Sequence, residues 1–198
     1  MRAHEIKQYD SVLQALGEPG CPICVLLKNL QTKLVQEGDI TEFLYLCNAH
    51  AWAIAAVRKT ESATRIFLSL LEHLPDTPRH ECSICIRLEQ EQILRTQELI
   101  AGLERKSVLE WISKQGTVCL PHGVGLRSEA PAPVRKIIDQ LLERRTSELK
   151  AALRHLLRDL SPESNQHSGL LGRAAEYLVS QRGVSLGWNL NKEQDCKS

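Results

Sequence analysis

The sequence predicts an all-α fold, and three observations lead to this fold class. Apolar residues recur every three or four positions over most of the chain, which is the period of a helix that buries one face. No segment shows a sustained alternation of apolar and polar residues, so strands are not predicted. Glycine and proline fall between the periodic segments, where they end helices.

The N-terminal half is expected to contain three helices in succession. The first covers residues 6–16 and stops at the glycines that follow. The second starts after the first pair of cysteines and ends near Gly38. From residue 51 the pattern fits one long helix that runs to Pro75, because proline cannot continue a helix.

The second pair of cysteines opens a further helix, which is followed by a short amphipathic segment at 108–115. Residues 123–133 read as a loop because glycine and proline are frequent there. Pro133 suits the first turn of a long helix that extends to about Leu160. A short closing helix follows, and residues 184–198 are expected to be loosely ordered. The inward positions of the last two helices are Ile137, Leu141, Leu149, Leu153, Leu156, Leu160, Leu170, Ala174 and Leu178.

The composition is that of a globular chain without a strong electrostatic bias. The 198 residues are 42% apolar and 25% charged, and the net charge of +1 creates no global attraction to nucleic acid. The longest apolar run, residues 51–57, is far below the roughly 20 residues that span a bilayer. The N-terminus also lacks the apolar core of a signal peptide. We therefore expect a cytoplasmic protein with no membrane partner.

Six of the seven cysteines fall into one pattern that occurs twice. Each copy consists of C-x2-C, a spacer and C-x2-H, with 22 intervening residues in the first copy and 33 in the second. This recurrence indicates a duplicated helical hairpin. The eight predicted metal ligands are Cys21, Cys24, Cys47, His50, Cys82, Cys85, Cys119 and His122.

The ligand types favour zinc, with two ions per chain. A C-x-x-C turn directs two thiolates at one centre, and a C-x-x-H at a helix start places a sulfur and an imidazole on one face. Three thiolates and one imidazole leave no open position for water, which is typical of a structural rather than a catalytic zinc site. An iron–sulfur cluster and thiol redox chemistry remain as alternatives, and disulfides are disfavoured in the cytoplasm.

The motifs GCPIC, CNAHAW and CLPHG, with a second C-x-x-C and a long charged helix, resemble an uncharacterised prokaryotic family. This family is a domain of unknown function with duplicated cysteine–histidine motifs of the CPxC…CxxH type. The resemblance covers nearly the whole chain and implies paired metal sites on the same eight residues. It implies no reaction, because the family has no established activity.

The ligand motifs can combine in three ways: within each copy, exchanged between copies, or as one four-cysteine site beside a site of two cysteines and two histidines. Pairing within each copy is favoured here because it closes the shorter loops. Residues 1–183 are then one helical metal-binding domain. Its first repeat covers about 18–75, its second about 79–160 and its closing helix about 168–182.

Other side chains are assigned ordinary structural roles. Trp52 and Trp111 are expected to shield the metal sites, and Cys196 is expected to be a free thiol. The histidines outside the motifs read as surface or helix-end residues, of which only His80 lies close enough to a cysteine pair to support a thiolate. The basic residues of the 135–158 helix are mixed with acidic ones, as on a solvated helix face.

No dinucleotide loop, Walker A sequence or nucleophile elbow is present, so enzymatic activity is not indicated. The leading hypothesis is a zinc-stabilised helical module that binds another macromolecule, most simply a protein. A redox-responsive zinc protein is the second hypothesis. The third is a nucleic-acid-binding protein that uses the basic ridge formed by Lys150, Arg154 and Arg158. The sequence defines neither the partner nor the oligomeric state.

Overall fold

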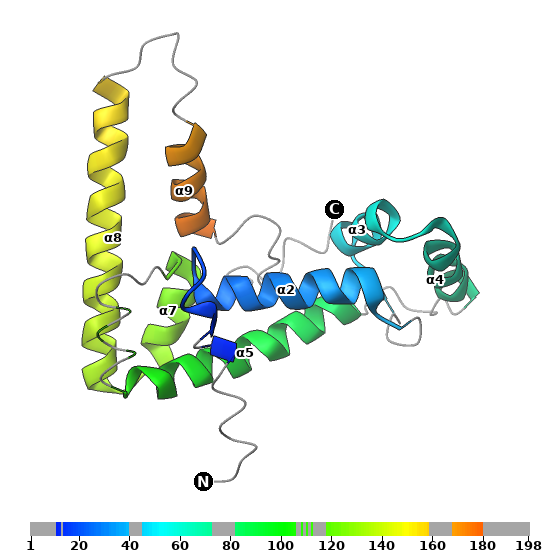
Figure 1. The fold of residues 1–198 in the computed structure, drawn as a ribbon, viewed down its shortest axis with the longest axis horizontal. Helices are drawn as coiled ribbons and strands as arrows, with labels where there is room; N and C mark the ends of the chain where they lie inside the picture. Colours follow the sequence, from blue (N-terminus) through cyan, green and yellow to red (C-terminus); the bar gives the residue numbers. More distant parts are fainter. Residues whose placement is uncertain are drawn as a thin grey trace. The chain divides into compact units, whose positions relative to one another are not determined.

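The computed structural model describes residues 11–39 without 13, then 45–72, 82–105, 108, 110, 112, 118–158 and 168–179. Within these residues the chain forms helices and no strand, which confirms the all-α prediction (Figure 1). The helices are α2 (Pro22–Glu37), α3 (Asn48–Val57), α4 (Thr60–Glu72), α5 (Ser83–Leu103), α7 (Leu120–Glu129), α8 (Ala132–Arg158) and α9 (Ser168–Val179). None of the helices among the described residues combines the length and hydropathy needed to cross a membrane.

The contacts divide the chain into two compact units, and each unit is assembled from separate stretches of sequence. Among the described residues, unit 1 contains 11–26 and those from 94 to 179, whereas unit 2 contains those from 27 to 93. Helix α2 begins in unit 1 and ends in unit 2, and α5 begins in unit 2 and ends in unit 1. These two helices are therefore shared by both units.

The two shared helices each bury one face, which is apolar in α2 and in α5 also includes the polar residues Gln92 and Thr96. In α2, Ile23 and Leu27 are fully buried and Leu34 nearly so. In α5 the buried apolar residues are Ile84, Leu88, Leu99 and Leu103. Pro22 starts α2 at a position where its missing N–H has no helical partner to lose.

The prediction of one long helix from residue 51 to Pro75 is wrong, because the chain breaks after Val57. Arg58 adopts an extended backbone with φ −82° and ψ 152°, which ends α3 before α4 starts at Thr60. Its guanidinium donates hydrogen bonds to the main-chain oxygens of Leu34 (3.1 Å), Val35 (2.6 Å) and Gly38 (2.7 Å). Arg58 therefore adds a charged donor at the last carbonyls of α2, of which the Leu34 carbonyl also accepts the N–H of Gly38 at 3.0 Å. The predicted helix end at Pro75 lies outside the described residues.

The loop predicted at 123–133 is also wrong, because most of it is helical. Residues 123–129 belong to α7, and only a short connection at Ala130 and Pro131 separates α7 from α8. One of the glycines that suggested a loop, Gly123, lies close to a side chain of α8 instead. A Cβ atom on Gly123 would lie 2.5 Å from Cδ2 of Leu142, so only glycine allows α8 to approach α7 this closely.

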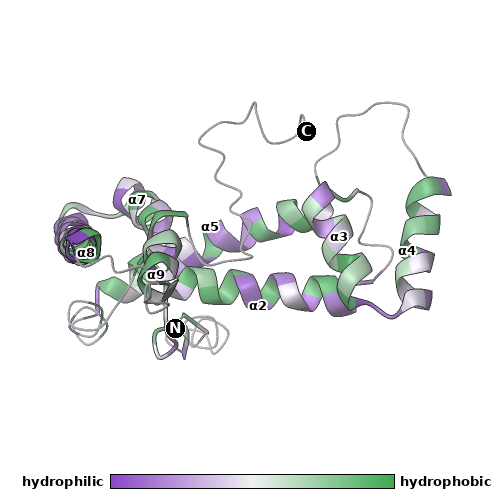
Figure 2. Cartoon of the chain, turned by 90° about the horizontal axis from the view of Figure 1, so that it is seen from above, coloured by the Kyte–Doolittle hydropathy of each residue, from purple (hydrophilic) through white to green (hydrophobic). Residues whose placement is uncertain are grey.

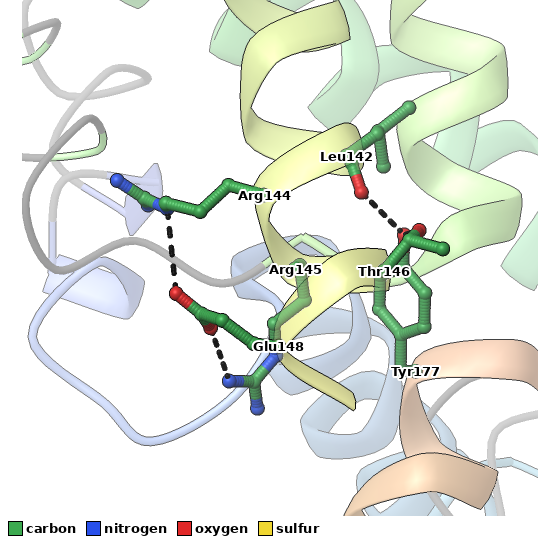
Figure 3. Close-up of polar contacts among 6 residues, drawn as sticks. All are labelled: Leu142, Arg144, Arg145, Thr146, Glu148 and Tyr177. Carbon is green, nitrogen blue, oxygen red and sulfur yellow. Dashed lines mark hydrogen bonds and ion pairs between the residues drawn. The ribbon is translucent and has the colours of Figure 1, made fainter. Parts of the chain in front are cut away.

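Helix α8 starts as predicted, with Pro133 in its first turn, and packs against α7 and α9. A small core joins Leu149 of α8 with Ala174 and Tyr177 of α9. The Tyr177 hydroxyl donates to the carbonyl of Leu142 (3.1 Å) and shares a 2.7 Å hydrogen bond with Thr146 (Figure 3). Of the inward positions predicted in the closing helix, Ala174 is buried and Leu170 half-buried, but Leu178 is 56% exposed. Tyr177 takes the inward place because its hydroxyl reaches polar atoms of α8.

Two glycine substitutions test the packing of α7 and α9. Gly172→Ala should raise the free energy of unfolding by about 0.5–1 kcal/mol, because alanine favours the helix and its Cβ would meet no atom within 4 Å. Gly123→Ala gains the same helix preference, but a cost of about 1–3 kcal/mol from overpacking against Leu142 should outweigh it. Urea unfolding of both variants measures the difference. Equal stabilisation by both would contradict the close approach of α7 and α8.

Candidate metal centres

The eight predicted ligands form two groups of four. Cluster 1 consists of Cys21, Cys24, Cys119 and His122, all buried. Cluster 2 consists of Cys47, His50, Cys82 and Cys85, of which Cys47 and Cys85 are half-buried. Each cluster lies within one unit, cluster 1 in unit 1 and cluster 2 in unit 2.

The local structure of each motif explains how its two ligands face one centre. The C-x-x-C motifs occupy the first turns of α2 and α5, and Cys47 and Cys119 stand at the N-caps of α3 and α7 with extended backbones. In both C-x-x-H motifs the histidine lies three residues later, in the first helical turn and therefore on the same side as the cysteine. The carbonyls of Cys47 and Cys119 accept the first helical hydrogen bonds at 2.9 and 2.8 Å, which fixes this register.

The favoured pairing within each copy is wrong, because each C-x-x-C motif meets the C-x-x-H motif of the other copy. The physical reason is the helix between the two motifs. The 16 residues of α2 extend about 24 Å, and the 21 residues of α5 about 31 Å, so each helix carries the chain away from the cysteines at its start. Since α2 and α5 end in the unit opposite to the one in which they begin, each C-x-x-H motif arrives beside the other copy's cysteines.

Backbone contacts in unit 2 support this exchange. The N–H of Ser83 donates to the carbonyl of Tyr45 at 3.0 Å, and the N–H of Tyr45 donates to the Ser83 hydroxyl at 3.4 Å. These two bonds attach the segment before Cys47 to the residue after Cys82. The contact is independent of the side chains of the cluster and gives the same pairing.

The distances within each cluster match four ligands around one ion. Zinc bonds of about 2.3 Å to sulfur and about 2.0 Å to nitrogen, at tetrahedral angles, place sulfurs about 3.8 Å apart and a nitrogen about 3.5 Å from each sulfur. In cluster 1 the Nδ1 atom of His122 lies 3.1–3.5 Å from the three sulfurs, and Sγ of Cys24 lies 3.6 Å from Sγ of Cys119. In cluster 2 Nδ1 of His50 lies 3.2–3.5 Å from the sulfurs, and Cys47 and Cys85 are 3.8 Å apart. Both clusters could therefore hold a metal ion.

The same distances show that the cysteines are thiols rather than disulfides. A disulfide bond is about 2.05 Å long, far shorter than the separations of 3.6 and 3.8 Å between neighbouring sulfurs. All six cysteines of the two clusters are free. Soft thiolate donors are therefore available in the form that binds zinc or iron.

The electrostatics of cluster 2 show how the ligands share protons without a cation. Hydrogen bonds from Cys82 and Cys85 lower the pKa of Cys47, and hydrogen bonds to the Cys47 and Cys82 sulfurs raise the pKa of Cys85. Burial lowers the pKa of His50, but its hydrogen bonds to the Cys47 and Cys82 sulfurs outweigh this and raise it to about 9. The cluster thus contains negative sulfur together with a thiol proton on Cys85 and an imidazolium on His50 at neutral pH.

In cluster 1, where all four ligands are buried, the pKa values of two cysteines also move in opposite directions. Burial opposes ionisation of Cys21, yet hydrogen bonds from Cys119, Cys24 and His122 lower its pKa well below the usual value. Hydrogen bonds to the Cys21 and Cys24 sulfurs raise the pKa of Cys119, and burial raises it further. A cation placed between these sulfurs would replace the protons and offset the repulsion among the thiolates.

Metal binding to cluster 2 should release two protons at pH 7, one from the Cys85 thiol and one from the His50 imidazolium. Because the pKa of His50 is raised to about 9, a proton competes with the metal for its ring nitrogen at every pH below that value, and the competition disappears as the pH rises through about 9. Metal affinity should therefore increase with pH below this value, by about 100-fold per unit if both protons are displaced. Titration of a Cys24→Ser variant in a weakly buffered solution counts the protons for cluster 2 alone. Affinity independent of pH between 6.5 and 8.5 would contradict the assignment.

The other residues singled out in the sequence have mixed outcomes. Trp52 is 72% exposed, so the prediction that it shields a metal site is wrong. Trp111, His80 and Cys196 lie outside the described residues. The ridge formed by Lys150, Arg154 and Arg158 is exposed along α8, and His155 on the same helix is exposed as well.

Comparisons with protein-family models, with curated proteins and with solved structures return no match. The class of the protein is therefore defined by its own fold and clusters. It is an all-α chain with two groups of three cysteines and one histidine, and these groups resemble duplicated metal-binding motifs.

Proposed function

We propose that clusters 1 and 2 each bind one zinc ion and that these ions hold the two units in their folded form. Three thiolates and one imidazole complete a tetrahedron without an open position, as structural zinc requires. The metal would act on stability rather than on chemistry.

An iron–sulfur cluster is the competing occupant. The ligands of a four-iron cluster bind different irons, whereas sulfurs only 3.6–3.8 Å apart favour a single shared ion. Metal analysis of protein purified under reducing conditions without added metal should give two zinc ions per chain and a colourless solution. A brown protein with iron and sulfide would contradict the proposal of zinc.

The cellular role that we propose is binding of another protein, and helix α3 carries this proposal. Between residues 49 and 57 every exposed side chain of α3 is apolar, including Trp52, which is 72% exposed. Figure 2 shows green and pale shades over most of α3, whereas purple covers much of α8. Tryptophan is enriched at the centres of protein interfaces, where it buries a large rigid surface at small entropic cost. Neighbouring alanines leave room for a partner to approach closely.

The chemistry of α3 favours a protein over a nucleic acid as the partner. The exposed residues from Ala49 to Val57 include no cation that could meet a phosphate. Arg144 and Arg145, which precede the basic ridge on α8, both pair with Glu148 (Figure 3). Exposed ion pairs of this type neutralise charge that a nucleic acid would require. Reduced thiols in both clusters are consistent with action in the cytoplasm.

Photo-crosslinking in the source cell tests the proposal. A benzophenone amino acid placed at Ala56, one helical turn from Trp52, should give a discrete protein adduct, and the same probe at Lys150 on α8 should not. Trp52→Ser should reduce the adduct from position 56 at least about tenfold, the usual effect of removing a tryptophan hot spot. Nuclease-sensitive adducts from position 150, with none from position 56, would instead identify a nucleic-acid-binding protein.

One observation favours a second role, in which cluster 2 responds to oxidation. Cys47 and Cys85 are its half-buried ligands, and their sulfurs lie 3.8 Å apart. Hydrogen peroxide would accept two electrons from the two thiolates, forming one disulfide and, with two protons, two molecules of water. Mild peroxide should then release one zinc ion per chain from cluster 2 and leave cluster 1 loaded. Loss of zinc from cluster 1 first would contradict this role.

A further inference from the structure

Cluster 1 borders a pocket with a volume of about 310 Å³. Cys21, Cys24 and Cys119 line the pocket together with Val118. The other lining residues come from the turn before α2 and from helices α8 and α9, and all of them belong to unit 1. They are Pro19, Gly20, Arg145, Arg173, Glu176 and Tyr177.

Two arginines in the pocket have donors to spare. A guanidinium offers five N–H donors, but among the residues that the structure describes Arg145 contacts only Glu148, at 3.4 Å. Figure 3 shows the Arg145 side chain beside Glu148 on α8. Arg173 on α9 makes no hydrogen bond or ion pair with any residue that the structure describes. Both arginines therefore can bind an external acceptor without breaking a strong internal bond.

The remaining polar groups of the pocket restrict what it can accept. The Tyr177 hydroxyl is occupied by Thr146 and the Leu142 carbonyl, so this side chain offers a rigid apolar wall. Glu176 is the acidic side chain among the lining residues, and it opposes an anion. In the zinc-loaded chain three thiolates and one divalent ion give cluster 1 one net negative charge, so the two guanidinium groups balance this charge and that of Glu176, and they act on an oxyanion as hydrogen-bond donors. A planar guanidinium matches the paired oxygens of a phosphate or a carboxylate.

Gly20, in the turn before α2, forms part of the wall of the pocket. Its φ of +108° is a conformation that L side chains rarely adopt, and a Cβ there would meet no atom within 4 Å. The turn therefore bends toward α2 without placing a side chain in the open space next to the pocket.

We propose that this pocket binds the oxyanion of a small molecule, a phosphate or a carboxylate, through Arg145 and Arg173 beside cluster 1. The site extends the proposed function, because a ligand there would contact the wall formed by the cysteines of a metal centre. It does not depend on the identity of the metal or on binding of a protein to α3. The carboxylate of Glu176 repels an oxyanion and therefore lowers the affinity that the two arginines provide.

Isothermal titration of the zinc-loaded full chain at low salt tests the pocket with three probes: inorganic phosphate, pyrophosphate and succinate. Arg173→Gln and Arg145→Gln should each weaken binding at least about tenfold, since a hydrogen bond to a charged group is lost. Glu176→Gln should tighten binding, because it removes the opposing charge. Arg154→Gln serves as the matched control, since this exposed arginine of α8 does not line the pocket.

Binding of phosphate or pyrophosphate alone would identify a phosphate ligand, and binding of succinate alone a carboxylate ligand. Binding of all three probes with the expected ranking of variants would support a general oxyanion site. No binding of any probe, or equal binding by the wild type and Arg173→Gln, would overturn the proposal. If the purified chain contains no metal but still binds the probes with the same ranking, the pocket stands and the proposed zinc function falls.

Discussion

Cys24→Ser should reduce the metal content from two ions to one per chain and lower the free energy of unfolding by roughly 3–5 kcal/mol. Cys24 is fully buried in cluster 1, and a serine hydroxyl is a poor replacement for a thiolate. The cost should remain below the order of 10 kcal/mol that structural zinc contributes in small peptides, because unit 1 has its own apolar core. Metal analysis combined with thermal unfolding measures both effects, and the melting temperature should fall by about 10 °C or more.

Cys196→Ser is the matched control for this substitution. The sequence predicts a free thiol at position 196, outside both ligand motifs. This variant should retain both metal ions and the stability of the wild type. A Cys24→Ser protein with two metal ions and an unchanged melting temperature would contradict a structural role for cluster 1.

Arg58→Ala should lower the free energy of unfolding by about 2–4 kcal/mol and weaken metal binding at cluster 2. The Arg58 guanidinium holds three carbonyls at the end of α2 and also donates to the Ser62 hydroxyl at 3.2 Å. Its loss leaves these carbonyls without a charged donor and frees the junction between α3 and α4. Since α3 carries His50, movement of this junction should loosen a metal ligand.

Arg65→Ala is the comparison for Arg58→Ala. Arg65 pairs with Glu61 at 2.8 Å, but their side chains are 67% and 79% exposed. Solvent screens such a pair, so its removal should change stability by less than about 0.5 kcal/mol. Denaturant unfolding and zinc affinity of both variants provide the test. Equal effects from Arg58 and Arg65 would show that α2 does not need its arginine cap.

Much of the fold was predictable because it follows from local rules. The helical spacing of the apolar residues and the positions of glycine and proline predicted the all-α class, the start of α2 after Cys21 and the start of α8 near Pro133. Local rules failed where tertiary contacts decide the outcome. At the break after Val57, Arg58 donates hydrogen bonds to the end of α2, a contact between helices that no local pattern predicts. Gly123 lies in a helix, where it packs against Leu142 of α8.

The candidate site divides in the same way. The eight ligands could be recognised because their spacing reflects a turn and one helical face, which are local features. The partner of each motif could not be read from loop length, since the helix between the motifs is a rigid rod rather than a flexible loop. The length of the α2 helix, about 24 Å, was the signal from which the exchange of ligand motifs between the copies could have been predicted. No sequence pattern predicted the pocket beside cluster 1, because Arg145 and Arg173 line the same pocket only as a result of the packing of α8 and α9.

The exchange of ligand motifs between the two copies is the central claim, and cadmium NMR tests it most directly. In protein loaded with ¹¹³Cd, scalar coupling through the metal–sulfur bond connects each ion with the β protons of its own cysteine ligands. We predict one cadmium resonance correlated with Cys21, Cys24 and Cys119, and a second correlated with Cys47, Cys82 and Cys85. A resonance that connects Cys21 and Cys24 with Cys47 would contradict the exchanged arrangement.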